Sequence, residues 1–286
     1  MVPIKGMAGL ADIYQKRPLR GMVDIDILVR EEEMEGVKEA LTELGYASSL
    51  CGLKEAYWLG RHCELAYVKK GKAPVDVHFR LDFKRPGRSP LPHLWERVQK
   101  VSIENRELSL LSPEDQLFSL ALHERRYGGK MLCLKNILDL AMILRKYGNG
   151  FDWDYVLREA RTGKMRATVF FILLQARTFF DAAVPDFLWK QLKIFERKKE
   201  AITRLIKDHT SVPASADKDK ELFLKSHFLL FDDPWEPIGY ILAIPIEQFA
   251  KYFGMEPYAK TTKFLYFLRF FYLPYRYICG KMSRRL

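Results

Sequence analysis

Two short apolar runs limit the possible folds of this chain, because both carry acids at positions that a strand would place on one side. In residues 23–29 the apolar side chains alternate with Asp24 and Asp26. This alternation predicts a strand whose apolar face lies in the core while both carboxylates point to the opposite face. Asp76 stands in the second run, residues 74–78, and a neighbouring strand would bring its carboxylate to the same face.

Three carboxylates on one face of a sheet repel one another, which raises their pKa values unless a cation lies between them. Hard divalent ions such as Mg2+ or Mn2+ prefer oxygen ligands and commonly bind together with phosphates. We therefore expect Asp24, Asp26 and Asp76 to be metal ligands and catalytic residues of a metal-dependent nucleotidyl transfer. The alternative for Asp24 and Asp26 is a strand face that is exposed to solvent and has no further role.

Length and charge bound the classes of protein to which the chain can belong. The 286 residues can bury a large core in one or two domains, and the formal net charge is +11. That excess of basic residues favours an anionic partner, such as a nucleotide, a nucleic acid or a membrane surface. The four cysteines lack the spacing of a metal site, which predicts reduced thiols in a cytoplasmic protein.

Short strands and one clear helix are predicted for the first part of the chain. Apolar residues recur at helical spacing over residues 34–44, and Gly45 ends this helix. Residues 57–69 and 74–81 are predicted to form two further strands, joined by a turn. This part, residues 1–83, is expected to form a minimal nucleotidyltransferase domain built on a small mixed β-sheet.

The second part of the chain is predicted to be helical. Residues 84–92 are rich in proline and indicate a linker or loop. Helices are predicted to start at Ser112 and Asp152 and to span residues 135–147, 166–180, 185–209, 219–231 and 237–253. The expected fold class is therefore α+β, with an α-helical domain at residues 90–286 after the sheet domain.

Several motifs follow one another in an order that is typical of one enzyme family. They are Lys5-Gly6, Tyr14, Arg20, Asp24-Ile25-Asp26 and Val75-Asp76-Val77-His78-Phe79. This order resembles the uncharacterised nucleotidyltransferase family, within the polymerase-β-like nucleotidyltransferase superfamily. The resemblance runs from Lys5 to about Trp153 and includes residues 111–117, His123 and residues 138–140.

The resemblance implies roles for the residues around the first helix. In the superfamily a glycine at the start of that helix lets the backbone approach the nucleotide phosphates, and Gly6 would take this position. The usual second small residue is Met7 here. Only residues 1–4 precede Lys5, so the chain resembles a member that lacks the N-terminal segment. A short first strand and an exposed sheet edge are expected as a result.

The resemblance also implies roles for the carboxylates and for the cations beside them. Asp24 and Asp26 would bind Mg2+, and Asp76 would complete a second metal site and favour the attacking oxygen. Lys5 and Arg20 would neutralise the phosphate charge, although both residue types are also common surface cations.

Four further residues stand close to these motifs. His78 shares the face of Asp76 and is a candidate contact to the nucleotide or to the metal ligands. His62 is a candidate for lining the cleft. His123 and Asp139 are expected either to contact the nucleotide or to form a hydrogen bond between the two domains.

Taken together, the sequence predicts a cytoplasmic nucleotidyltransferase that moves a nucleoside monophosphate from a nucleoside triphosphate to an acceptor. The acceptor could be a small molecule, a peptide or a protein, and the base preference stays open. Two alternatives remain: an antitoxin that adenylylates its toxin, and a non-catalytic protein that binds nucleotides or nucleic acid. Residues 257–286 hold seven basic side chains and no acid. Residues 264–286 are therefore a candidate contact to a partner or to a membrane at its periphery.

Overall fold

The computed structural model describes most of the chain. The described residues are 1–14, 20–50, 55–84, 91–103, 106–127, 134–210, 228–233, 235–237, 246–269 and 271. The predicted linker at 84–92 and the predicted helices at 219–231 and 237–253 lie partly outside these ranges. Most of the candidate contact at 264–286 lies outside them as well.

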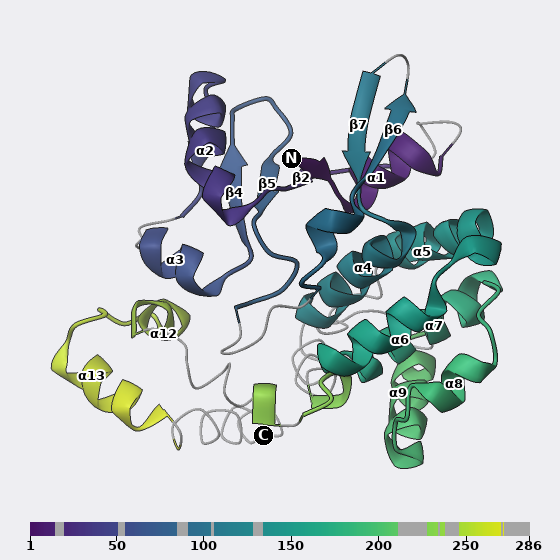
Figure 1. Cartoon of the computed structure of the whole chain (residues 1–286). Helices are drawn as coiled ribbons and strands as arrows, with labels where there is room; N and C mark the ends of the chain where they lie inside the picture. Colours follow the sequence, from purple (N-terminus) through teal and green to yellow (C-terminus); the bar gives the residue numbers. More distant parts are fainter. Residues whose placement is uncertain are drawn as a thin grey trace. The chain divides into compact units, whose positions relative to one another are not determined.

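A five-stranded mixed sheet forms the centre of the N-terminal part, with the strand order β1-β2-β5-β4-β3. Figure 1 labels its strands β2, β4 and β5. Its strands are β1 (Val2–Pro3), β2 (Ile25–Leu28), β3 (Ala47–Ser48), β4 (Glu64–Val68) and β5 (Val75–His78). β2 and β5 run parallel, while the other neighbouring pairs are antiparallel. The predicted α+β class with a small mixed sheet is confirmed. β1 has two residues and lies at the edge of the sheet, as expected.

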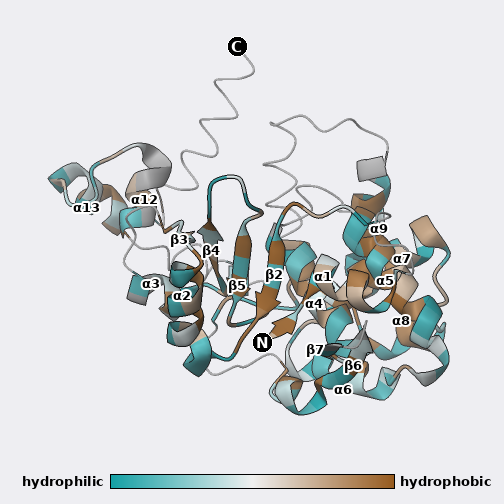
Figure 2. Ribbon diagram, turned by 90° about the horizontal axis from the view of Figure 1, so that it is seen from above, coloured by the Kyte–Doolittle hydropathy of each residue, from teal (hydrophilic) through white to brown (hydrophobic). Residues whose placement is uncertain are grey.

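One face of the sheet packs against α2 (Met34–Glu43) and α3 (Glu55–Arg61). The buried side chains of this core are Val29, Met34, Leu41, Leu65, Tyr67, Val75, Val77 and Phe79. Figure 2 shows the hydrophobic residues along β2 and β5. Because side chains alternate along a strand, the residues between these apolar positions point to the opposite face.

The strand predicted at residues 57–69 is correct only in its second half. Residues 57–61 belong to α3 instead, and β4 begins at Glu64. Glu55 in the first turn and Arg61 in the last turn of α3 both favour a helix through its dipole. The Trp58 indole donates a hydrogen bond of 2.6 Å to the carbonyl of Glu64, which ties this helix to the start of the strand.

Helices dominate the chain after residue 112. They are α4 (Pro113–Tyr127), α5 (Leu134–Tyr147), α6 (Trp153–Thr162), α7 (Arg166–Phe180), α8 (Phe187–Gln191) and α9 (Glu196–Thr210). The predicted caps are present: the Ser112 hydroxyl accepts from the Asp115 amide at 3.2 Å, and Asp152 accepts from the Tyr155 amide at 2.9 Å. Most of α7 is buried, as predicted from its apolar residues.

Neighbouring residues of α4 connect the helices to the sheet. Arg125 is fully buried and forms an ion pair with Asp82, which follows β5. Arg126 forms an ion pair of 2.7 Å with Glu64 at the start of β4. The first helix, α1 (Lys5–Asp12), contacts β2, α4 and α5, and so lies on the sheet face that α2 and α3 leave open (Figure 1).

A two-stranded hairpin was not predicted from the sequence. It consists of β6 (Gln99–Ile103) and β7 (Arg106–Leu110), which pair in antiparallel register. The hairpin precedes α4, and β7 contacts β1.

The chain forms two compact units, residues 1–232 and residues 233–286. The first unit contains the sheet and helices α1–α9. In the second, α12 (Ile246–Phe253) packs against α13 (Lys260–Phe267) through Phe249 and Tyr266. The division into domains at residues 1–83 and 90–286 stays a prediction. None of the described helices combines the length and apolar character needed to cross a membrane.

Candidate functional site

The predicted carboxylates lie on neighbouring strands of the sheet. Asp26 of β2 is the register partner of Asp76 of β5, and partners in a parallel pair point to the same face. Asp24 stands two residues before Asp26, directly ahead of β2. Its charge contributes to the raised pKa of Asp76, so the three carboxylates are close enough to interact. They lie on the face opposite the core formed with α2 and α3.

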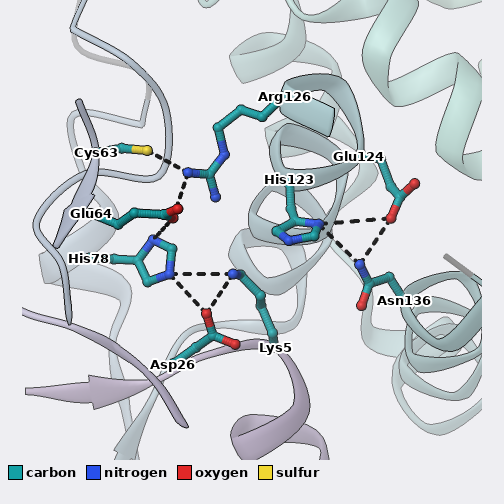
Figure 3. A network of polar contacts seen from close by, with 9 residues as sticks. All are labelled: Lys5, Asp26, Cys63, Glu64, His78, His123, Glu124, Arg126 and Asn136. Carbon is teal, nitrogen blue, oxygen red and sulfur yellow. Dashed lines mark hydrogen bonds and ion pairs between the residues drawn. The ribbon is translucent and has the colours of Figure 1, made fainter. Parts of the chain in front are cut away.

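Lys5 places a cation directly on this carboxylate face. Its Nζ lies 2.6 Å from Oδ1 of Asp26 and 3.3 Å from Nε2 of His78 (Figure 3). The same Oδ1 lies 2.9 Å from Nε2 of His78. Lys5 is the first residue of α1 and has a φ of 51°, in the left-handed region that residues with a Cβ rarely adopt. The start of the helix is therefore strained where its ammonium meets Asp26.

A further carboxylate, that of Glu64, extends the network of Lys5, Asp26 and His78 toward α4. Its Oε2 lies 3.2 Å from Nδ1 of His78 and forms the ion pair with Arg126 (Figure 3). Arg126 also contacts the sulfur of Cys63. Neither Glu64 nor Arg126 was predicted as a site residue. Alternation within one strand does not reveal Glu64, because its role depends on the pairing of β4 with β5, in which Glu64 is the register partner of His78.

The network keeps Asp26 and Glu64 ionised although both are largely buried. Burial alone would raise the pKa of Asp26, but the hydrogen bond with His78 and the charge of Lys5 hold it well below its ordinary range. Burial also opposes the ionisation of Glu64, yet Arg126, with His78 and Lys5, lowers its pKa to about 2. Burial, followed by the charge of Lys5, lowers the pKa of His78, which favours the neutral ring.

Asp76 has the opposite environment. Among the described residues it has no hydrogen-bond or ion-pair partner, and burial together with Glu64, Asp26 and Asp24 raises its pKa to about 6. Lys5 opposes this shift only in part. Among the described residues, the charge of the Asp76 carboxylate is thus offset only in part, by Lys5.

The donor atoms of this face suit a hard divalent ion, since Asp24, Asp26 and Asp76 all offer carboxylate oxygens. In the part of the chain that the structure describes, however, no three acids, histidines or cysteines stand close enough together to hold a metal ion. The Lys5 ammonium occupies one oxygen of Asp26 instead. The residue types therefore fit Mg2+ or Mn2+. In the arrangement shown, the Lys5 ammonium lies at the oxygen of Asp26 where a metal ion would bind.

Arg20 is bound by a carboxylate of the helical part. Its Nε and one terminal nitrogen lie 2.9 and 2.8 Å from the two oxygens of Asp139 on α5. The hydroxyl of Tyr14 donates to the same carboxylate at 2.7 Å. Arg20 and Asp139 are both buried. Asp139 thus pairs with Arg20, whereas a bond between separate domains and a phosphate contact of Arg20 stay predictions.

Gly6 lies where an added side chain would meet its neighbours. A Cβ at this position would stand 3.0 Å from the sulfur of Met22 and 3.5 Å from the guanidinium carbon of Arg20. Gly6 is the second residue of α1, as predicted, and its backbone is free of a side chain at the start of the helix. The start of the helix is therefore packed against Met22 and Arg20, and any side chain at Gly6 would crowd them.

The other two candidate histidines, His62 and His123, contact other groups. His123 lies 3.1 Å from the side-chain nitrogen of Asn136, which also donates to Glu124 (Figure 3). His62 stacks on Trp58, with ring centroids 3.5 Å apart. Burial lowers the pKa of His62 to about 4, so its ring is neutral.

A groove away from these carboxylates has a volume of about 790 Å³. It lies between α7, α8 and α9, and its lining includes Trp189, Lys199 and Arg204. None of the predicted site residues contributes to its lining.

Comparison with protein families gives one match. A family model described as "Uncharacterised nucleotidyltransferase" matches residues 1–181, which contain the sheet, the carboxylates and helices α1 to α7. No curated protein and no solved structure matches the chain.

Proposed function

Since the chain belongs to the uncharacterised nucleotidyltransferase family, and is a nucleotidyltransferase in that general sense, we propose a specific reaction for it. With Mg2+ or Mn2+, it transfers a nucleoside monophosphate from a nucleoside triphosphate to an acceptor hydroxyl or phosphate and releases pyrophosphate. The observation that carries this proposal is the register of Asp26 and Asp76 on one sheet face, beside the N-terminus of α1.

The residues of the site have separable roles in this reaction. Asp24, Asp26 and Asp76 would hold the divalent ion, which supplies positive charge to the attacking and leaving oxygens. Gly6 has no Cβ and would let phosphate oxygens approach the amides that begin α1. His78 holds Asp26 in a fixed orientation through the 2.9 Å contact between Nε2 and Oδ1.

Metal-dependent release of pyrophosphate tests this reaction. Each of the four nucleoside triphosphates is incubated with the protein and Mg2+ or Mn2+, with and without EDTA. Replacing Asp26→Asn should lower the rate by about 100-fold or more, equivalent to about 3 kcal/mol of transition-state stabilisation. The matched control is Glu35→Gln, an exposed carboxylate on α2, which should leave the rate unchanged. Release that survives EDTA, or that Asp26→Asn does not slow, would refute the metal-dependent reaction.

The two alternative functions predict different results when the purified protein is tested for bound partners and for pyrophosphate release. An antitoxin that adenylylates its toxin would co-purify with a small protein and label it from ATP. A non-catalytic nucleotide-binding or nucleic-acid-binding protein would bind its ligand but release no pyrophosphate with any triphosphate.

We also propose that the protein is cytoplasmic and contacts an anionic membrane at its periphery. In the second unit Phe264 and Phe267 of α13 are exposed and stand three residues apart, which places them on one side of that helix. Phe271, beyond the end of α13, is exposed as well. Residues 257–286 hold seven basic side chains and no acid, and their positive charge is complementary to that of anionic lipids.

A further inference from the structure

We propose that Lys5 is an exchangeable internal cation: its ammonium neutralises Asp26 in the metal-free protein and moves to the nucleotide phosphates when a divalent ion binds. This inference rests on the proposed nucleotidyl transfer, because it concerns the same site. The inference adds to that function a competition between the Lys5 ammonium and the divalent ion for the carboxylate of Asp26.

The geometry excludes simultaneous occupation of the same oxygen position. The Lys5 Nζ lies 2.6 Å from Oδ1 of Asp26, and the side chains of both residues are only 9% exposed. A Mg2+ ion would need a carboxylate oxygen at about 2.1 Å. Two cations that close to one buried oxygen repel each other strongly, since little water screens them. Ion binding at this oxygen of Asp26 therefore requires the ammonium to leave.

The position of Lys5 gives the ammonium another anion to pair with. It is the first residue of α1, next to Gly6, and the unpaired amides at a helix start favour phosphate oxygens. Its flexible four-carbon side chain can turn without moving the helix. Transfer from Asp26 to phosphate keeps the charge paired throughout, which avoids the cost of a bare buried ammonium.

The rest of the network keeps Asp26 in place when Lys5 leaves. His78 retains its 2.9 Å contact with Oδ1, and Glu64 with Arg126 supports the far side of the imidazole ring. Asp76 has no described cation of its own, so the incoming ion balances the charge of both aspartates. Lys5 is thus the replaceable member of the network, and His78 the fixed one.

Direct measurement of Mn2+ binding without nucleotide tests this exchange. Free Mn2+ is followed by electron paramagnetic resonance in titrations of the unmodified protein and of Lys5→Met. Removing the competing charge should tighten Mn2+ binding by about tenfold or more. Lys5→Arg retains a cation and should bind Mn2+ as weakly as the unmodified protein. Equal or weaker binding by Lys5→Met overturns the exchange.

A matched control separates competition from the general loss of an ion pair. Lys146 forms a 2.6 Å pair with Asp12 at the other end of α1, so Lys146→Met removes a pair of the same length far from Asp26. Its Mn2+ affinity should equal that of the unmodified protein. Lys5→Gly provides a second test, because glycine tolerates the φ of 51° and relieves the strained helix start. It should also bind Mn2+ more tightly.

The exchange and the transfer reaction fail in different ways. If Lys5→Met binds Mn2+ no better while the unmodified protein releases pyrophosphate, the exchange is wrong and the proposed function stands. If pyrophosphate is never released but Lys5→Met and Lys5→Gly bind Mn2+ more tightly, the metal site and the exchange stand without that reaction.

Discussion

Asp26 and Asp76 are neighbours with the same side chain, yet their ionisation is controlled in opposite ways. Lys5 and His78 keep Asp26 ionised, whereas burial and three nearby carboxylates raise the pKa of Asp76 to about 6. The difference comes from His78 and Lys5, which both contact the carboxylate of Asp26. Residue type alone therefore does not determine which carboxylate carries a proton near neutral pH.

Asp76 should make the metal-free protein less stable as the pH rises. Its pKa is raised from 3.8 to about 6, so the folded state binds the proton more tightly than the unfolded state does. The resulting stabilisation is complete below pH 3.8 and is lost as the pH rises through about 6. The substitution Asp76→Asn changes the free energy of unfolding, and this change should be more stabilising at pH 7.5 than at pH 4. Urea denaturation in EDTA measures this, and an equal effect at both pH values would contradict it.

Alternation along two strands was sufficient to place Asp26 and Asp76 on one face from the sequence. The pair between Lys5 and Asp26 was not predictable in this way, because it depends on how the first turn of α1 meets β2. Glu64 was missed because its role depends on which strand lies beside β5. Side-chain pairing across strands follows from sheet order, which alternation within a strand does not reveal.

At the scale of elements, α1 is held at both of its ends. Lys5 holds its first residue to Asp26, and Asp12 at its end pairs with Lys146 and Tyr147 of α5. Just beyond the helix, Tyr14 donates to Asp139, which also binds Arg20. The helix that presents Gly6 is thus held between the sheet and α5.

Replacing Asp139→Asn should destabilise the protein by about 3 kcal/mol, because it removes one partner of a buried ion pair with the guanidinium of Arg20. The matched control is Asp186→Asn, which breaks the Arg177–Asp186 pair of the same 2.8 Å length at the surface. That exposed pair should contribute less than about 1 kcal/mol. The free energy of unfolding in urea measures both, and similar losses for the two variants would contradict a buried role for Arg20.

Most helices were predictable because their caps and apolar spacing are local. Ser112, Asp152 and the buried α7 followed from a few neighbouring residues. Residues 57–61 were misassigned because aromatic residues favour strands, while the acid and base at the two ends of α3 favour a helix. Local preferences conflict there, and packing of Trp58 against the start of β4 decides between them.

At the scale of the whole molecule, the exposed aromatics of the second unit should determine membrane binding. The full chain should float with anionic liposomes, whereas a chain without residues 264–286 should not. The double variant Phe264→Ser/Phe267→Ser should lower the bound fraction severalfold, because it removes two exposed apolar side chains. Phe195→Ser, an equally exposed aromatic of the first unit, is the control. Equal flotation of the full and shortened chains would contradict membrane binding.

The parallel pairing of β2 with β5 has a consequence for how the protein folds. Asp26 and Asp76 are brought together across fifty residues of intervening chain, so their strands can join only after a long loop has closed. Two like charges meet at that late step, with Lys5 available to screen only one of them. The slowest part of refolding is therefore expected to respond to acidity and to dissolved cations, through the same acids that are proposed to carry out the chemistry.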